Sequence, residues 1–272
     1  MDVNTFKDIP PWDWPDGTGK QLLDILRDDR ATESDRVVAA ELAGDLIVMN
    51  DELADALISV LQGADRSEKI RGQAAISLGP VLEHVDTVGF EDADDLSIAE
   101  PTFLRIQESL GRLYLDGNVP KEVRRRILEA SVRAPQDWHQ GAVGTAFSSG
   151  DVAWRLTAVF CMRFVRGFDE QILEALDSKE PHIHYEAVLA AGNWEVDAAW
   201  PHIAALVISG DTGKSLLLAA IEAVATIRPH EAVEILEGLA DSDDEDIVAA
   251  VDEAMAMAHG LSDEDEDEDD GS

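Results

Sequence analysis

The sequence predicts an all-α protein in which helix pairs stack into a solenoid, and three observations support this prediction. Related helical segments recur at a nearly constant step, because Arg124, Arg155, Glu186, Leu218 and Ala249 open similar sequences at intervals of 31, 31, 32 and 31 residues. Prolines number only 10 and tyrosines 2, whereas Ala, Leu, Glu and Arg are common. The alternation of β-branched residues that is typical of strands is hard to find. A fixed period of this length indicates an array of stacked repeats.

Residues 1–17 are expected to form an irregular N-terminal cap. The stretch from Ile9 to Gly17 contains three prolines and ends on glycine, and both residue types oppose a helix. Terminal repeats of an array need a cover for their outer face. We expect Trp12 and Trp14 to provide that cover.

Fourteen helices, or seven pairs, are expected in a solenoid that spans residues 18–259. Capping residues are found before the early helices, at Thr18, Ser34, Asn50 or Asp51, and Ser67. Prolines in the first turn support five of the later helices. The expected helices span 20–29, 36–45, 51–61, 67–78, 101–115, 120–134, 135–147, 151–165, 168–176, 181–191, 195–208, 214–227, 229–240 and 243–258.

An acidic loop is expected at residues 84–100, inserted into one repeat. Arg36 and Arg71, which open two earlier second helices, are 35 residues apart, whereas Arg71 and Arg124 are 53 apart. The excess of about 20 residues is rich in aspartate. Insertions in repeat arrays are often used for binding, but a solvated linker would give the same pattern.

The chain is strongly acidic, with a net charge of −36, and part of the excess is the unbroken run of eight acids from Asp263 to Asp270. Such a run repels itself, so residues 260–272 are expected to form a disordered acidic tail. The acidic body would repel nucleic acids and anionic membranes.

The sequence shows neither a signal peptide nor an apolar run of 18 residues, and Cys161 is the only cysteine. We therefore expect a soluble cytoplasmic protein.

The helix pairs resemble HEAT repeats, an armadillo-like family. In that family a leucine-rich first helix is followed by a short acidic turn and a second helix of small residues, as in ILEALDSKEPHIHYEAVLAAG at 172–192 and AVEILEGLADSDDEDIVAAV at 232–251. The resemblance covers roughly residues 20–258 and implies a right-handed α-solenoid of about seven stacked antiparallel helix pairs. It also implies that the second helices line a concave binding surface. The arginine that often opens the second helix for inter-repeat bonding is missing at Glu186, Leu218 and Ala249.

The segment 119–168 combines arginines with aromatic residues. Its charge is 8 − 4 = +4, so the rest of the chain carries −36 − 4 = −40. Arginines beside aromatic side chains are the usual composition of a protein-binding hot spot, and arginine can bind a carboxylate or phosphate with two hydrogen bonds. The candidate partner-binding residues are Arg124, Arg125, Arg155, Arg163, Trp138 and Trp154.

A structural role for these residues is the alternative. Glu122, Arg126, Glu129 and Arg133 are spaced as a ladder of ion pairs on one helix. Trp154 has the spacing of a core residue. On this interpretation the arginines stabilise the repeats and contact no partner.

Histidines near the start of one expected helix suggest a metal site. His182 and Glu186 share a helical face, His184 lies between them, and His202 belongs to the next helix. A closed site requires a third or fourth ligand, which is not evident nearby. Some HEAT-type hydroxylases bind iron through repeated His-Glu dipeptides, but here only His230-Glu231 is such a dipeptide. We therefore expect no metal and no cofactor.

Two further motifs are set aside. The segment Ser209 to Ser215 ends in Gly-Lys-Ser but lacks the first glycine and the preceding strand of a phosphate-binding loop. Cys161 is expected to be a small buried hydrophobic residue, because no partner base for a nucleophile is evident.

Three functions follow. The first is a non-catalytic scaffold that binds an acidic or extended segment of a partner protein on its concave face. The second is a nucleic-acid binder or DNA glycosylase-type enzyme, since some HEAT-like glycosylases grip damaged DNA with Trp, Asp and Arg, roles open to Trp138, Trp154, Asp137 and Arg155. The acidic charge opposes it, because phosphate contacts dominate such affinity. The third is a metalloenzyme using His182, His184 and Glu186. We expect the scaffold, with no catalytic residue.

Overall fold

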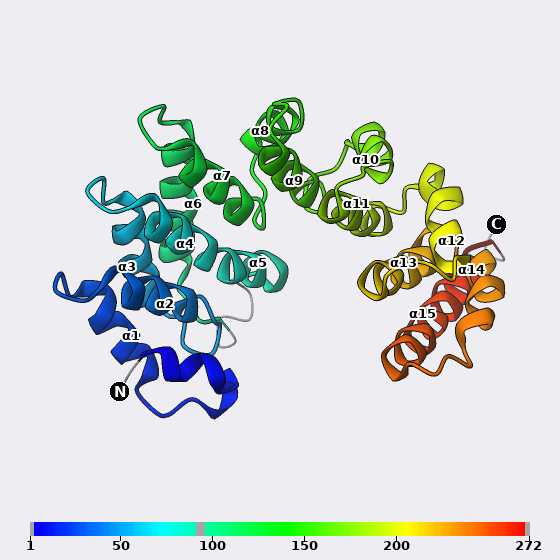
Figure 1. Ribbon diagram of the computed structural model, residues 1–272, viewed down its shortest axis with the longest axis horizontal. Coiled ribbons are helices and arrows are strands. Elements are labelled where there is room, and N and C mark those ends of the chain that lie inside the picture. Colours follow the sequence, from blue (N-terminus) through cyan, green and yellow to red (C-terminus); the bar gives the residue numbers. More distant parts are fainter. Residues whose placement is uncertain (1–2, 91–95, 270–272) are drawn as a thin grey trace. The chain divides into compact units, whose positions relative to one another are not determined.

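The chain is all-helical throughout the part that its computed structural model describes, residues 3–90 and 96–269, with side chains described through Ala258. Fifteen α-helices and several short 3-10 helices occur in these ranges, and no strand does. The all-α prediction is therefore confirmed. The chain forms two compact units, Met1–Ala142 and Val143–Ser272 (Figure 1).

The first unit contains two rows of helices. One row is α1 (Thr18–Arg27), α3 (Asp51–Gln62) and α6 (Glu100–Leu115), and the other is α2 (Glu33–Ala43), α4 (Glu68–Ser77) and α7 (Lys121–Ser131). Successive helices of each row contact one another, and α1 packs on α2, α3 on α4 and α6 on α7. Large aliphatic side chains fill the space between the rows, among them the fully buried Leu57, Leu61, Ile70, Ile106, Leu110 and Ile127. Helix α8 (Trp138–Phe147) leads from the first unit into the second.

The second unit repeats this arrangement. Helices α9 (Val152–Cys161), α11 (Pro181–Asn193), α13 (Lys214–Ile227) and α15 (Glu245–Asp269) contact one another in succession (Figure 1). Against them pack α10 (Asp169–Leu176) on α11, α12 (Trp200–Ile208) on α13, and α14 (Pro229–Leu236) on α15. Small residues allow close approach between neighbouring helices of the α9, α11, α13 and α15 row. A Cβ atom added at Gly192 of α11 would lie 2.8 Å from the Cβ of Ala223 on α13.

Side chains cap several helices as the sequence predicts. Asn50 accepts a hydrogen bond from the backbone N–H of Leu53, and Ser67 from that of Ile70. Asp151, which we expected as the first residue of its helix, instead caps it, accepting from the N–H groups of Ala153 and Trp154. Two further positions differ. Thr32, not Ser34, caps α2, and α1 begins after Gly17, whose φ of 83° is a left-handed conformation that glycine adopts without a steric penalty.

Helix α5 (Gly79–Val88) corrects the expected course of the chain after residue 78. The Gly79-Pro80 pair does end α4, but a new helix starts immediately, because a proline in the first turn lacks only an N–H that would have no helical acceptor. Val81, Leu82 and Val85 are buried and hold α5 in place. Residues 84–88 of the expected acidic loop are therefore helical, and residues 91–95 lie outside the described part of the chain.

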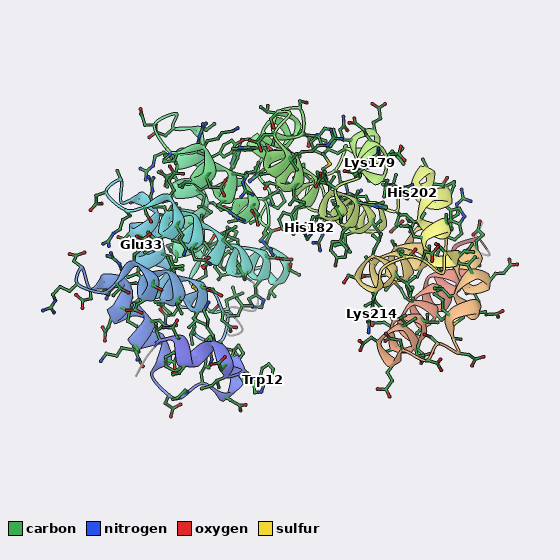
Figure 2. The ribbon with its side chains drawn as sticks, in the orientation of Figure 1. Trp12, Glu33, Lys179, His182, His202 and Lys214 are labelled. Atoms are coloured by element: carbon green, nitrogen blue, oxygen red, sulfur yellow. The ribbon has the colours of Figure 1, made fainter. Side chains whose placement is uncertain are left out.

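The N-terminal segment is also more ordered than expected. Val3–Asp8 and Pro11–Asp13 form 3-10 helices, and the side chains of Val3 and Phe6 are buried. Trp14 packs against the core of the first unit, as expected of a cap, but Trp12 is 76% exposed and projects outward (Figure 2). The cap is therefore built from Phe6 and Trp14, not from the two tryptophans.

The two largest boundary differences from the sequence prediction in the second unit are the start of α12 and the end of α15. The helix expected from residue 195 begins at Trp200, because Glu195 has a positive φ of 50° and a 3-10 turn, Asp197–Ala199, follows. Helix α15 continues to Asp269, over most of the segment that we expected to be disordered. No proline interrupts this stretch, so the hydrogen-bonding pattern of the packed part can continue. Residues 270–272 are outside the described range.

Candidate binding groove

The six arginines and tryptophans expected to bind a partner are divided between the two units. Arg124, Arg125 and Trp138 belong to the first, and Trp154, Arg155 and Arg163 to the second.

In the first unit Arg125 and Trp138 make contacts with other side chains of that unit. Arg125 is buried and forms ion pairs with Glu122 at 2.5 Å and Glu129 at 3.6 Å. The hydrogen bond from Arg125 lowers the pKa of the Glu122 carboxyl. The Nε atom of Arg124 is buried and has no hydrogen-bond partner among the described residues. Trp138 packs against Tyr114 with the two rings tilted and their centroids 4.9 Å apart, and its indole N–H donates to Gln136.

In the second unit the same pattern holds. Arg155 forms an ion pair with Glu174 at 2.6 Å and lies over the ring of Phe147 at 4.4 Å. Arg163 forms an ion pair with Glu186 at 3.5 Å, and Trp154 is buried. These contacts are what the structural alternative expects. A role of the six residues in partner binding stays a prediction.

The histidines do not form the metal site that the sequence suggested. His182 is exposed, Glu186 faces Arg163, and His184 contacts His202 of the next helix instead. The carboxylate of Glu186 is thus engaged by a cation and the imidazole of His184 by a second imidazole. Within the described ranges no group of three or more His, Cys, Asp or Glu is arranged to hold a metal ion.

The two motifs set aside in the sequence have ordinary structural roles. The segment before Lys214 follows helix α12, and Lys214 pairs with Asp244 at 2.8 Å and with Asp246 at 2.6 Å. Cys161 is fully buried at the end of α9.

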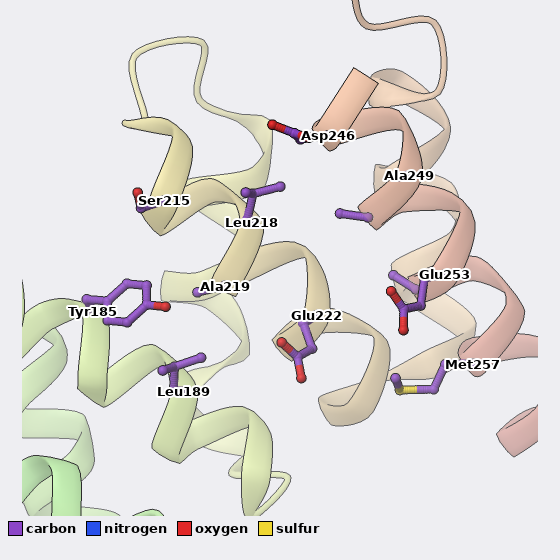
Figure 3. Close-up of a pocket in the computed structure, with 12 residues that line it drawn as sticks. Tyr185, Leu189, Ser215, Leu218, Ala219, Glu222, Asp246, Ala249, Glu253 and Met257 are labelled. Atoms are coloured by element: carbon purple, nitrogen blue, oxygen red, sulfur yellow. The ribbon is translucent and has the colours of Figure 1, made fainter. Parts of the chain in front are cut away.

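A groove that the sequence did not indicate lies in the second unit, on the surfaces of α11, α13 and α15 (Figure 3). Its volume is about 560 Å³, and a smaller hollow of about 220 Å³ extends it between α11 and α13, sharing Leu189, Ala219 and Glu222. Apolar side chains form its floor. The larger ones are half-buried: Tyr185 and Leu189 from α11, Leu218 from α13, and Met257 from α15.

Carboxylates are the charged groups of this groove. Glu222 of α13 and Glu253 of α15 are exposed and extend from neighbouring helices, and neither forms an ion pair with another described residue (Figure 3). Asp246, the third acid, is paired with Lys214. Beside the smaller hollow Glu195 adds a fourth carboxylate, and Arg163 lines that hollow as its cation. The groove therefore combines an apolar floor with negative charge that its own unit leaves partly unbalanced.

Sequence reasoning missed this groove because its residues are far apart in the chain and individually ordinary. One signal was available. Tyr185, Leu218 and Ala249 lie at or beside the repeat positions 186, 218 and 249, and the repeat alignment places them at equivalent points of successive helices. These three residues therefore form an apolar strip that runs from one helix to the next, and no single helix sequence shows it.

Comparisons with known proteins add only distant likenesses. No protein-family model and no curated protein matches the chain. Among solved structures, human deoxyhypusine hydroxylase in complex with glycerol is similar at 18% identity over 91% of this chain and 86% of that protein, with a TM-score of 0.41. Two engineered proteins are similar with TM-scores of 0.46 and 0.45, at 19% and 15% identity, over 78% and 89% of this chain and 98% and 78% of theirs. These likenesses are too low to carry over a function.

No helix in the described ranges has both the length and the apolar character required to span a membrane.

Proposed function

We propose that this chain is a non-catalytic protein-interaction module, and that the groove on α11, α13 and α15 binds a cationic amphipathic segment of a partner protein. The observation that carries the proposal is the lining of the groove, where an apolar floor lies beside Glu222 and Glu253.

The apolar floor supports a protein as the ligand. Protein interfaces typically have an apolar, aromatic or methionine-rich centre and a polar rim. Tyr185, Leu218 and Met257 provide such a centre, and the exposed carboxylates surround it. An amphipathic helix that lays its apolar face in a groove is a recurring mode of peptide recognition.

The charge of the groove supports a cationic ligand. Glu222 and Glu253 have no ion-pair partner among the described residues, so lysine or arginine side chains of a ligand can pair with them. The net charge of −36 adds a long-range attraction for cationic partners and raises the rate of association.

We further propose that the helix pairs of both units belong to one HEAT-like, right-handed solenoid of about seven pairs. Support comes from the packing within each unit, where successive second helices contact one another. The helices α2, α4, α7, α11, α13 and α15 each also contact the helix that precedes them in the chain. In such an array the groove would lie on the face lined by second helices, which the resemblance to HEAT repeats assigns to binding.

The alternatives have less support. An acidic partner would depend on arginines whose carboxylate partners lie within the chain, such as Arg155 with Glu174 and Arg163 with Glu186. A nucleic acid would meet the same arginines and the negative charge of the protein.

Binding of two designed helical peptides tests the proposal. One carries leucines on one face and lysines on the other, and its matched control carries glutamates in place of the lysines. We expect the full chain to bind the lysine peptide in preference to the glutamate peptide, measured by fluorescence anisotropy at moderate salt, which screens long-range attraction. Peptide binding should also shift the NMR signal of the Met257 methyl group.

Two charge-reversal variants separate the groove from the general acidity of the protein. Glu222→Lys/Glu253→Lys changes the groove, whereas Glu170→Lys/Glu234→Lys changes the net charge equally on α10 and α14. We expect the first variant to weaken binding about tenfold or more, since like charges brought together cost on the order of 1 kcal/mol or more, and the second to weaken it little. Equal weakening by both variants, or no binding by the wild type, would contradict the proposal.

A further inference from the structure

Two histidines of the second unit face each other across neighbouring helices. The Nε2 atom of His184, on α11, lies 2.9 Å from the Nε2 atom of His202, on α12. The two rings are nearly perpendicular, with centroids 5.1 Å apart and an interplanar angle of 78°. Without an ion, one imidazole must donate an N–H while the other offers its lone pair. The same two nitrogen atoms can instead direct both lone pairs at a shared cation.

We propose that His184 and His202 form a two-histidine binding site for a divalent transition metal ion, with Zn²⁺ as the representative case, which links α11 to α12. Neutral imidazole nitrogen is a preferred ligand of zinc, copper and nickel ions.

The distance between the two nitrogens fits this use. Zinc–nitrogen bonds are about 2.0–2.1 Å long, so two nitrogens on one tetrahedral zinc ion lie roughly 3.4 Å apart. The observed 2.9 Å therefore requires the rings to separate by about half an ångström. Side-chain rotation can supply that movement, because both rings are only partly buried.

A carboxylate lies on the far side of one ring. The Oδ1 atom of Asp177 is 4.0 Å from Nδ1 of His202. Metal-binding histidines commonly donate their other ring N–H to a carboxylate, which fixes the tautomer and orients the ring. At 4.0 Å this carboxylate is beyond hydrogen-bond distance, but rotation of the exposed Asp177 side chain would let it accept the Nδ1–H of His202. In that position Asp177 is the positioning residue of the site, because it favours the Nδ1–H tautomer and leaves Nε2 of His202 for the metal.

The site is open to solvent. The His202 side chain is 33% exposed and that of Asp177 87%. His184 also lines a hollow of about 710 Å³ at the start of α11 and α13. Water molecules can therefore complete the coordination of an ion held by two imidazoles, as in metal sites with open positions.

Two lysines line this hollow, and a buried positive charge there would repel a metal cation. Lys214 pairs with Asp244 and Asp246 and Lys179 is exposed, so neither leaves a buried positive charge beside the ion.

Metal binding would fasten two consecutive helices together. His184 belongs to the helix that packs on α10, and His202 to the helix that packs on α13, so the ion would join two neighbouring helix pairs. Because a metal that binds only the native state stabilises it by mass action, unfolding should shift to a higher temperature as the metal concentration rises.

Calorimetric titration of the full chain with ZnCl₂ tests the proposal. The protein is first treated with a chelator and dialysed, and excess Mg²⁺ is present to occupy carboxylate clusters, because magnesium prefers oxygen ligands. We expect one zinc ion per chain and a rise in the unfolding temperature. His184→Ala and His202→Ala should each abolish this binding or weaken it by more than the roughly 10–100-fold that loss of an outer-shell partner costs, and Asp177→Asn should weaken it about tenfold.

His182→Ala is the matched control, since this exposed histidine is two residues from His184 and lines the same hollow. It should leave zinc affinity and the unfolding shift unchanged, and circular dichroism should show equal helix content in all four variants. Zinc binding that survives both His184→Ala and His202→Ala would overturn the proposal as adventitious binding elsewhere, and so would the absence of one-to-one binding by the wild type.

Discussion

Nη1 of Arg163 lies 3.5 Å from a carboxylate oxygen of Glu186, and this ion pair joins the end of the α9 segment to α11 within the second unit. Arg163 also lies near the rings of Phe160 and Phe164, at 5.6 and 5.8 Å from their centroids. The pair is more shielded than that of Arg155 with Glu174, because the Glu186 side chain is 18% exposed and that of Glu174 is 61% exposed. This difference predicts a difference in stability.

We expect Arg163→Ala to lower the free energy of unfolding by about 1–2 kcal/mol, because it removes a cation that pairs with a largely shielded carboxylate. Arg155→Ala is the comparison, and should cost less than about 1 kcal/mol, as exposed ion pairs generally do. Urea unfolding monitored by circular dichroism measures both values. Equal losses would mean that shielding of Glu186 has no energetic effect.

The sequence predicts the helices well because their determinants are local. Capping residues such as Asn50 and Ser67 and the spacing of small residues define most helices without reference to tertiary structure. The prediction fails where a local signal has two meanings. Gly79-Pro80 ends one helix and also starts the next, and Pro80 alone does not distinguish these cases.

The candidate site was harder to predict because its determinants are not local. The sequence shows that arginines and aromatic residues gather at 119–168, but it does not show that Arg155 and Arg163 already have carboxylate partners 19 and 23 residues further along. The groove depends on Tyr185, Leu218 and Met257, which come together only when α11, α13 and α15 are packed side by side. A repeat period predicts the order of the helices, but it does not predict which face of each helix stays exposed after the helices pack.

Close contact between α11 and α13 makes Gly192 sensitive to substitution. A Cβ atom at this position would lie 2.8 Å from the Cβ and 2.9 Å from the Cα of Ala223, too close for backbone atoms to yield easily. We expect Gly192→Ala to lower the free energy of unfolding by about 1–3 kcal/mol through overpacking.

Gly144→Ala on α8 is the control, measured in the same urea titration. Its Cβ would meet only the ring of Phe168, at an ordinary 3.9 Å. There the higher helix propensity of alanine should raise stability by up to about 1 kcal/mol. A Gly192→Ala variant as stable as wild type would show that α11 and α13 are less closely packed than described.

The N-terminal cap gives a prediction from two neighbouring tryptophans. The indole N–H of Trp14 donates to the carbonyl oxygens of Phe6 at 3.1 Å and Ile9 at 3.0 Å, and its ring contacts that of Phe6. We expect Trp14→Ala to cost about 2 kcal/mol or more, below the roughly 3–5 kcal/mol typical of a fully buried tryptophan. Trp12→Ala should change stability by less than about 0.5 kcal/mol, because Trp12 is 76% exposed. Thermal unfolding of the two variants measures both changes in stability. A larger loss of stability in Trp12→Ala than in Trp14→Ala would contradict the assignment of Trp14 to the cap.

His139 is the histidine most affected by its surroundings in the first unit. It is fully buried, its Nδ1 accepts a hydrogen bond from the backbone N–H of Gln136 at 2.9 Å, and its Nε2 lies 3.0 Å from the hydroxyl oxygen of Ser131. Burial lowers the pKa of His139 to about 4, while the carbonyl oxygen of Gln136 opposes that shift. The accepted N–H bond assigns the neutral tautomer with its proton on Nε2, which then donates to Ser131.

This pKa predicts a loss of stability in mild acid. Because the folded-state pKa lies below the unfolded value of about 6.5, the unfolded chain takes up the proton first as the pH falls. The contribution of neutral His139 is complete above about pH 6.5 and is lost progressively toward pH 4, by on the order of 3 kcal/mol. The stability difference between wild type and His139→Gln, which cannot titrate there, should shrink by that amount over this range, so that carboxylate titrations shared by both proteins cancel. Direct NMR titration of the His139 ring gives an independent check, and a midpoint near pH 6.5 would contradict both its burial and the predicted acid sensitivity.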